Sequence, residues 1–247
     1  MGRAIWEKLT ARTGKIHRMN LTKLLQSQGF GTRRECRGLI LSGRVEISGE
    51  AVTDAEADVD PEGLAFLVSG ESWQYREKAY VMLHKPPGYE CSLKPKHHPS
   101  VLSLLPVQLR NRGLQTVGRL DEDTTGLLLL TDDGQFLHRY TSPKKNIAKV
   151  YRATVKHPLS EEQLNALRTG VVLHDDPEPV AAQSAVAHDA QTLELTLTGG
   201  KYHQVKRMVA AVGNRVEVLH RERMGAYTLP PDLAPGEWRY VEADSAC

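Results

Sequence analysis

The pattern of hydrophobic and polar positions near the start of the chain predicts two short helices followed by a β-hairpin. A leucine stripe at positions 21–25 has helical spacing, and Gly29 is placed to end that helix. Residues 32–35 form a capping-box pattern, Thr-x-x-Glu, ahead of a second apolar stripe that stops at Gly43. Residues 45–52 then alternate around a Ser-Gly turn, as a short hairpin does. Elements of this size enclose only a small core.

Beyond position 79 the pattern changes to strands that alternate with helices. The expected strands lie at 80–84, 127–131, 150–155 and 193–197. The expected helices begin at Asp132 or Asp133, at Ser160, and after the Gly199-Gly200 pair. The last helix carries an apolar stripe that leaves Lys206 off its core face. This mixture predicts an α+β fold rather than a regular βαβ repeat.

The chain therefore divides into four expected segments. They are a basic N-terminal extension at 1–18, a small domain at 19–70, a polar linker at 71–79, and a larger domain at 80–247.

Composition narrows the class of protein. The chain is 40% hydrophobic and 25% charged, values typical of a globular protein, which excludes wholesale disorder. The longest apolar run, 127–130, is far shorter than the roughly 20 residues that span a bilayer, and the N-terminus lacks the apolar core of a secretory signal. The three cysteines are widely spaced, which argues against a disulfide framework or a cysteine-rich zinc site. These features predict a cytoplasmic protein with no membrane partner.

The net charge of +2 conceals a strong segregation of charge along the chain. Basic residues dominate 1–18, 139–152 and 201–223, whereas 51–71 carries six acidic residues and no Lys or Arg. A single cluster of this kind is ordinary solvated surface. Several in one chain favour a nucleic-acid partner.

The segment 118–126, Gly-Arg-Leu-Asp-Glu-Asp-Thr-Thr-Gly, is the most unusual part of the sequence. It precedes a buried strand, so its polar groups are held on a rigid element. Asp121 and Asp123 have the spacing of a metal pair, although no His or Cys lies nearby. A carboxylate pair for glycoside hydrolysis and a simple turn are the other interpretations. No nucleophile-elbow, Walker, dinucleotide-binding or zinc-protease motif is present.

Four ordered motifs resemble those of the RsuA family of pseudouridine synthases. They are Lys-Pro-Pro-Gly-Tyr at 85–89, Gly-Arg-Leu-Asp at 118–121 with 124–133, Lys-Val-Tyr at 149–151, and His-Gln-Val-Lys-Arg-Met at 203–208. The resemblance covers about residues 80–240. More loosely, 19–70 resembles the small RNA-binding domain of this family, although the usual opening Arg-Leu-Asp-Lys reads Asn-Leu-Thr-Lys at 20–23. The resemblance implies a mixed, largely antiparallel catalytic sheet.

The resemblance also implies a reaction in which uracil leaves its ribose and reattaches through C5, without cofactor or metal. Asp121 would be the catalytic carboxylate, and Lys206 the cation beside it, with Arg207 as the alternative occupant of that place. Tyr151 would stack on the target base and assist removal of the C5 proton. Leu219 would line the base pocket, and Arg119 would fill the space of the flipped nucleotide.

Arg207 and three further lysines complete the expected substrate-binding set. Lys85 belongs to the first motif, and Lys144 and Lys145 follow a helix end where they would contact phosphates. The implied partner is ribosomal RNA, most closely that of the small subunit, within a partly assembled particle or free, and the protein would act as a monomer. Large-subunit rRNA or tRNA, a non-catalytic rRNA assembly factor, and a metal-dependent hydrolase are the alternatives.

Overall fold

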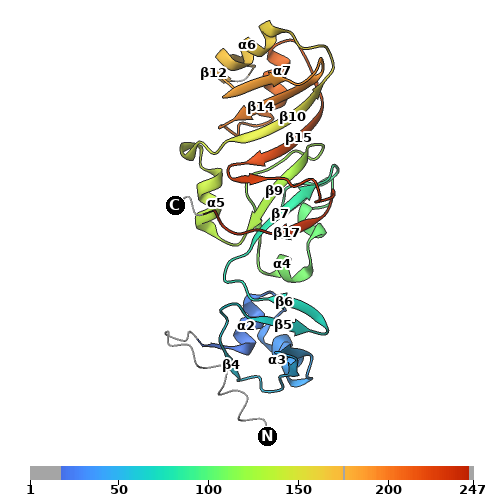
Figure 1. Ribbon diagram of the computed structural model, residues 1–247, viewed down its shortest axis with the longest axis vertical. Coiled ribbons are helices and arrows are strands. Elements are labelled where there is room, and N and C mark those ends of the chain that lie inside the picture. The colour runs from blue at the N-terminus through green and yellow to red at the C-terminus, as the bar shows by residue number, and fades with distance from the viewer. Residues whose placement is uncertain (1–17, 175, 245–247) are drawn as a thin grey trace. The chain divides into compact units, whose positions relative to one another are not determined.

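The computed structural model describes residues 18–174 and 176–244, which form two compact units (Figure 1). The first unit runs to Glu77 and includes Val107–Arg112, whereas the second contains Lys78–Pro106 and the chain from Gly113 onward. Apart from its last residue, the basic extension expected at 1–18 lies outside the described residues.

The first unit places three short helices against small antiparallel sheets. Its helices are α2 (Leu21–Ser27), α3 (Arg33–Leu41) and α4 (Val107–Asn111). Its larger sheet has the order β3-β2-β5-β6, with bounds Glu50–Ala51, Val45–Ile47, Ala65–Val68 and Glu71–Gln74, and β1 (Met19–Asn20) pairs with β4 (Asp58–Val59). The two helices and the hairpin predicted from the sequence are confirmed.

The sequence signals that start and end these helices act as expected. The Thr32 hydroxyl accepts a hydrogen bond from the backbone N–H of Glu35, and the Glu35 carboxylate accepts one from the N–H of Thr32 at 2.7 Å. Gly29 follows α2 with φ +84°, and a Cβ there would lie 2.0 Å from the Gln108 carbonyl oxygen of α4. Gly29 is therefore required both by its backbone conformation and by the close approach of α4.

The linker expected at 71–79 is wrong over its first half. Residues Glu71–Gln74 form β6, which pairs antiparallel with β5 and places Trp73 opposite Phe66. Trp73 also packs edge-to-face on Phe30, with ring centroids 5.1 Å apart. Three of the four β6 residues are exposed, so a strand this short leaves no alternation that sequence reading can recognise.

The second unit is built on a nine-stranded sheet. Its main path is β13-β14-β10-β15-β9-β7-β17, with β16 beside β15 and β8 beside β9. The strands are β7 (Tyr80–Lys85), β8 (Gln115–Thr116), β9 (Thr125–Thr131), β10 (Lys149–Val155), β13 (Ser184–Ala187), β14 (Thr192–Leu197), β15 (Val216–Met224), β16 (Tyr227–Thr228) and β17 (Trp238–Tyr240). Among the described strands of this sheet, only β9 and β15 pair in parallel. The α+β fold with a mixed, largely antiparallel sheet is thus confirmed.

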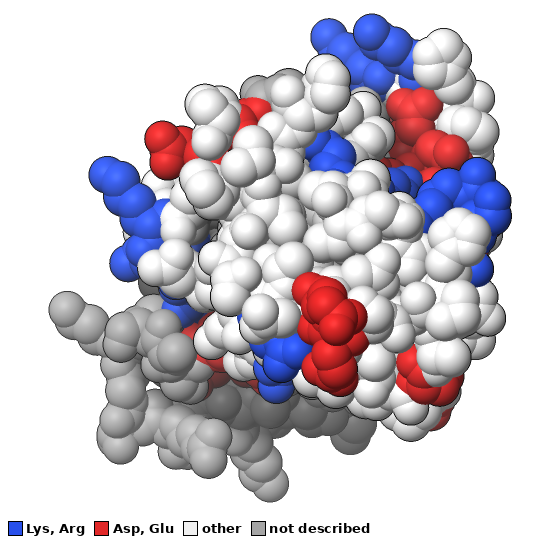
Figure 2. Space-filling model, turned by 90° about the horizontal axis from the view of Figure 1, so that it is seen from above, with Lys and Arg blue, Asp and Glu red and all other residues white. Residues whose placement is uncertain are grey.

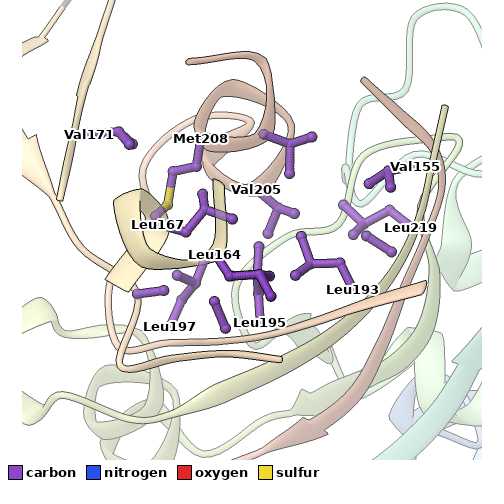
Figure 3. Close-up of a cluster of buried hydrophobic side chains, with 14 of the residues drawn as sticks. Val155, Leu164, Leu167, Val171, Leu193, Leu195, Leu197, Val205, Met208 and Leu219 are labelled. Atoms are coloured by element: carbon purple, nitrogen blue, oxygen red, sulfur yellow. The ribbon is translucent and has the colours of Figure 1, made fainter. Parts of the chain in front are cut away.

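Helices α6 and α7 cover one face of this sheet (Figure 1). The remaining elements of the unit are α5 (Gly134–Thr141), α6 (Glu161–Thr169), α7 (Gln204–Ala211), the 3-10 helices η2 (Val101–Leu104) and η3 (Pro143–Lys145), and the pair β11 (Val171–Leu173) and β12 (Asp176–Val180). Figure 3 shows Val205 and Met208 of α7 in one cluster with Leu164 and Leu167 of α6 and the leucines of β14. Within residues 18–174 and 176–244, no helix has the length and apolar character needed to cross a bilayer.

The structure shows which of two neighbouring aspartates caps α5, a choice that the sequence left open. Asp133 caps α5 by accepting a hydrogen bond from the N–H of Gln135, whereas Asp132 accepts one from the N–H of Ala79. Helix α7 begins differently, because its cap residue His203 has a left-handed backbone, with φ +46°. A bulky side chain rarely adopts this conformation, and such strain is concentrated at functional sites.

Gly126 allows the parallel pairing at the centre of the sheet. It has φ +108°, and a Cβ there would lie 2.3 Å from the backbone oxygen of Arg221 on β15. Strands β9 and β15 can therefore approach this closely only with glycine at position 126.

Candidate active site

A cavity of about 660 Å³ opens in the second unit, where loops meet the sheet. The β8–β9 loop contributes one wall, strands β10 and β15 contribute another, and the segment leading into α7 closes the site. The cavity brings together five of the residues expected from the sequence: Asp121, Tyr151, Lys206, Arg119 and Leu219.

Both carboxylate oxygens of Asp121 have partners from the start of α7. The Nζ of Lys206 lies 3.3 Å from Oδ2, and the Nε2 of His203 lies 3.1 Å from Oδ1. The expected pairing of Asp121 with Lys206, rather than Arg207, is therefore present. Sequence reasoning missed His203, because nothing in the motif signals that its backbone turns the ring toward the carboxylate. The ring also stacks on Tyr202, with centroids 3.7 Å apart.

Lys206 bridges two carboxylates of the same loop. Its Nζ donates to Oδ1 and Oδ2 of Asp123, at 2.7 Å and 2.8 Å. Partial burial opposes ionisation of Asp123, but the hydrogen bond and charge of Lys206 outweigh it and lower the pKa of Asp123. Burial likewise opposes the charge on Lys206, but Asp123 and Asp121 together raise the pKa of Lys206. The ammonium is thus held charged between the two carboxylates.

Lys85 has a different position from the one expected. Its side chain is fully buried, does not line the cavity, and donates to the backbone carbonyls of Pro86, Glu122 and Thr124 at 2.9–3.1 Å. Burial lowers the pKa of Lys85, against the opposing influence of Cys91 and the acidic loop. Lys85 therefore fixes the backbone of the loop that carries Asp121. It does not lie at the cavity surface, where the resemblance had led us to expect a substrate contact.

Tyr151 and Leu219 form the strand wall of the cavity. Tyr151 of β10 lies opposite Arg221 of β15, and Leu219 precedes Arg221 by two residues, so all three side chains share one face of the sheet. From the sequence, Arg221 belonged to the basic segment 201–223 and had no role of its own at the site.

Three of the expected substrate contacts, Arg207, Lys144 and Lys145, do not line the cavity. Arg207 donates to the backbone carbonyl of Tyr202 at 3.0 Å. Lys144 and Lys145 are exposed in η3, directly after Pro143, which does line the cavity. Arg119 is exposed at the cavity. In the view of Figure 2, Lys and Arg form separate groups, and acidic side chains lie between the two groups at the upper right.

The metal interpretation of the acidic loop finds no support in this geometry. The carboxylates of Asp121 and Asp123 share the ammonium of Lys206, which occupies the place a cation would take. Over the part of the chain that the structure describes, no three His, Cys, Asp or Glu side chains gather as a metal site would need.

Comparisons with known proteins agree with this arrangement. Residues 79–211 match the RNA pseudouridylate synthase family, and residues 19–63 match the S4 domain. The chain is 42% identical to ribosomal small subunit pseudouridine synthase A of Yersinia pestis over 90% of its length and 94% of the relative's, and 42% identical to that of Escherichia coli strain K12 over 90% and 95%. It is 41% identical to an uncharacterized RNA pseudouridine synthase of Bacillus subtilis, over 90% and 94%.

A solved structure extends the likeness to the fold. A crystal structure of a pseudouridylate synthase matches with a TM-score of 0.64 and 36% identity, covering 91% of this chain and 96% of that one. Sequence, fold and cavity agree, and the chain belongs to the RNA pseudouridine synthases, with an S4 domain ahead of the synthase domain.

Proposed function

We propose that the protein converts uridine to pseudouridine in small-subunit rRNA, in the cytoplasm and as a monomer. The observation that carries this proposal is the Asp121 carboxylate, held between Lys206 and His203 at one wall of a cavity whose other wall bears Tyr151. Support for the substrate comes from the relatives named ribosomal small subunit pseudouridine synthase A, which align with 90% of this chain.

In this proposal Asp121 acts at the ribose of the target nucleotide, either as nucleophile at the anomeric carbon or as base for the neighbouring hydrogen. The bond between C1′ and N1 breaks, and a bond between C1′ and C5 forms. The proton on C5 leaves and N1 gains one, so no redox partner is required. Lys206 supplies the counter-charge to Asp121, and His203 fixes the second carboxylate oxygen.

Tyr151 and Leu219 provide a partly apolar surface on which a uracil ring can stack and turn. A uridine must leave its RNA helix to reach them, at a cost of a few kcal/mol that is smallest for unpaired nucleotides. In this proposal Arg119 occupies the space that the flipped nucleotide vacates, and its exposed position at the cavity supports this role.

RNA contacts outside the cavity complete the proposal. The S4 domain and the exposed pair Lys144 and Lys145 bind the RNA around the target, chiefly through its phosphates. The substrate is rRNA, free or within a partly assembled small subunit.

The test compares the purified protein with an Asp121→Asn variant. Each is incubated with unmodified small-subunit rRNA, naked and bound to ribosomal proteins, and pseudouridine is mapped by mass spectrometry of nuclease fragments. The native protein should modify a defined uridine and Asp121→Asn should not, because the amide lacks the required negative charge. A matched control, Asp232→Asn at an exposed ion pair, should retain activity.

Large-subunit rRNA and tRNA serve as the competing substrates. Modification of one of these alone would refute the small-subunit assignment and leave the synthase assignment intact. Substantial turnover by Asp121→Asn would refute the role of Asp121. Mapping pseudouridine in rRNA from cells that lack the protein should show the same site unmodified.

A further inference from the structure

Arg221 is a buried cation that the reaction outlined above does not use. Only 2% of the residue is exposed, yet it lines the cavity. Its Nε donates to the carbonyl of Leu127 at 2.9 Å, whereas its Nη2 is buried and has no hydrogen-bond partner among the described residues. No carboxylate of the described chain forms an ion pair with it.

A second cation lies beside it without an acidic partner. Lys149 precedes Tyr151 by two residues on β10, lines the same cavity, and donates to the carbonyl of Ile147 at 2.9 Å, with the carbonyls of Thr198 and Gly199 at 3.4 Å. Burial and then the charge of Arg221 lower the pKa of Lys149, so the two cations are close enough to repel each other.

This arrangement surrounds the tyrosine wall with positive charge. Arg221 is the cross-strand neighbour of Tyr151, and Lys149 lies along the same strand on the same face. Burying charged groups without counter-charges destabilises a fold, so an unpaired buried donor at a cavity points to a ligand that completes it. The ligand must be an anion or carry anionic oxygens.

We infer that Arg221 and Lys149 form an anion subsite that binds the uracil ring as it separates from the ribose. The inference rests on the proposed function. When the C1′–N1 bond breaks, its electron pair stays with uracil, and the negative charge spreads over N1, O2 and O4. The subsite stabilises this anion until C1′ bonds to C5, the C5 proton leaves, and N1 is protonated.

The electrostatic role predicts a specific loss of rate. Removing one preorganised donor to a developing anion typically costs about 100-fold or more in the chemical step. Arg221→Gln should therefore slow single-turnover cleavage about 100-fold while RNA affinity changes much less. Arg221→Lys should recover part of the loss, because it restores the charge without the guanidinium geometry. Arg168→Gln, on α6 and away from the cavity, is the matched control for the lost charge.

The test uses small-subunit rRNA transcribed with either uridine or 5-fluorouridine. Fluorine withdraws electrons and stabilises the uracil anion, so the loss caused by Arg221→Gln should be smaller with 5-fluorouridine than with uridine. Consumption of the target nucleoside is followed by mass spectrometry, affinity by filter binding, and folding by urea denaturation. Lys149→Met provides a second variant should Arg221→Gln not fold. Its loss of rate should likewise be smaller with 5-fluorouridine than with uridine.

The possible outcomes separate the two proposals. A native protein that modifies no rRNA would overturn the proposed function, and the anion subsite with it. An active native protein with an undiminished rate in Arg221→Gln and Lys149→Met would overturn the subsite alone. Equal losses on uridine and 5-fluorouridine would also overturn it, because a purely structural role is insensitive to the leaving group.

Discussion

Replacing Lys206 by Met should lower the reaction rate much more than it lowers the stability of the fold. We expect this contrast to be larger than for any other change at the site. The side chain of similar length preserves packing on α7 but removes the ammonium that bridges Asp121 and Asp123. Asp121 and Asp123 are then left close together without the ammonium between them. We expect the single-turnover rate to fall about 100-fold, or about 2.7 kcal/mol in activation free energy, as for the loss of one preorganised electrostatic contact.

The expected loss of stability is smaller. The Asp123 side chain is 57% exposed and that of Asp121 is 30% exposed, so solvent screens both pairs, and an exposed pair contributes about 0.2–1 kcal/mol. A total of about 1 kcal/mol would lower the melting temperature by about 2–4 °C. The pKa of Asp123 is lowered and that of Lys206 raised, so this contribution exists between their ordinary values of 3.8 and 10.5. It disappears as pH falls through the lowered pKa of Asp123 or rises through the raised pKa of Lys206.

Single-turnover kinetics, filter binding and thermal unfolding of the same preparations check these values. Asp123→Asn is the companion variant, because it leaves Lys206 paired with Asp121 and should reduce the rate less than about tenfold. If Lys206→Met lost only RNA affinity and kept its single-turnover rate, Lys206 would be a phosphate contact. The ion pair between Lys206 and Asp121 would then not contribute to the chemical step.

Three further predictions concern the surroundings of the site. Lys144→Ala and Lys145→Ala should each lower the salt dependence of RNA binding by about one unit and leave the rate on saturating substrate unchanged, as salt titrations would show. His203→Gly should slow the chemical step because Asp121 loses a partner, while urea denaturation shows little loss of stability, since glycine relieves the positive φ. Asp244→Asn should cost about 1–3 kcal/mol in urea unfolding, because the Asp244 carboxylate accepts hydrogen bonds from Tyr140 and Arg139 on α5.

The helices were predictable wherever the chain carries its own start and stop signals. The capping boxes at Thr32 and Ser160 both form, with the reciprocal hydrogen bonds that the sequence pattern implies. The alternation of leucines at 193–197 likewise gives β14. These signals lie within a few residues of one another, so they can be recognised in the sequence without knowledge of the tertiary structure.

Features that depend on distant contacts were not predictable. β6 exists because it pairs with β5, and Val107–Arg112 joins the first unit across a long stretch of sequence, through the hydrogen bond from Arg112 to Gln28. A lysine before two prolines reads as surface, yet Lys85 is buried because three backbone carbonyls converge on it. The polarity of Arg221 gives no sign that β15 is central, so its burial could be learned only from the sheet order.

The position of β15 has a consequence for when the enzyme can first work during synthesis. The sheet consists of a β7–β9 part that holds the Asp121 loop and a β10–β14 part that holds Tyr151, and along its main path β15 alone joins them. That strand is Val216–Met224, which follows β7, β9, β10 and β14 in the sequence. A nascent chain without it has two partial sheets with open edges. Folding of the catalytic cavity must therefore wait until β15 has been synthesised, and chains that end before this strand cannot act on RNA as active enzymes.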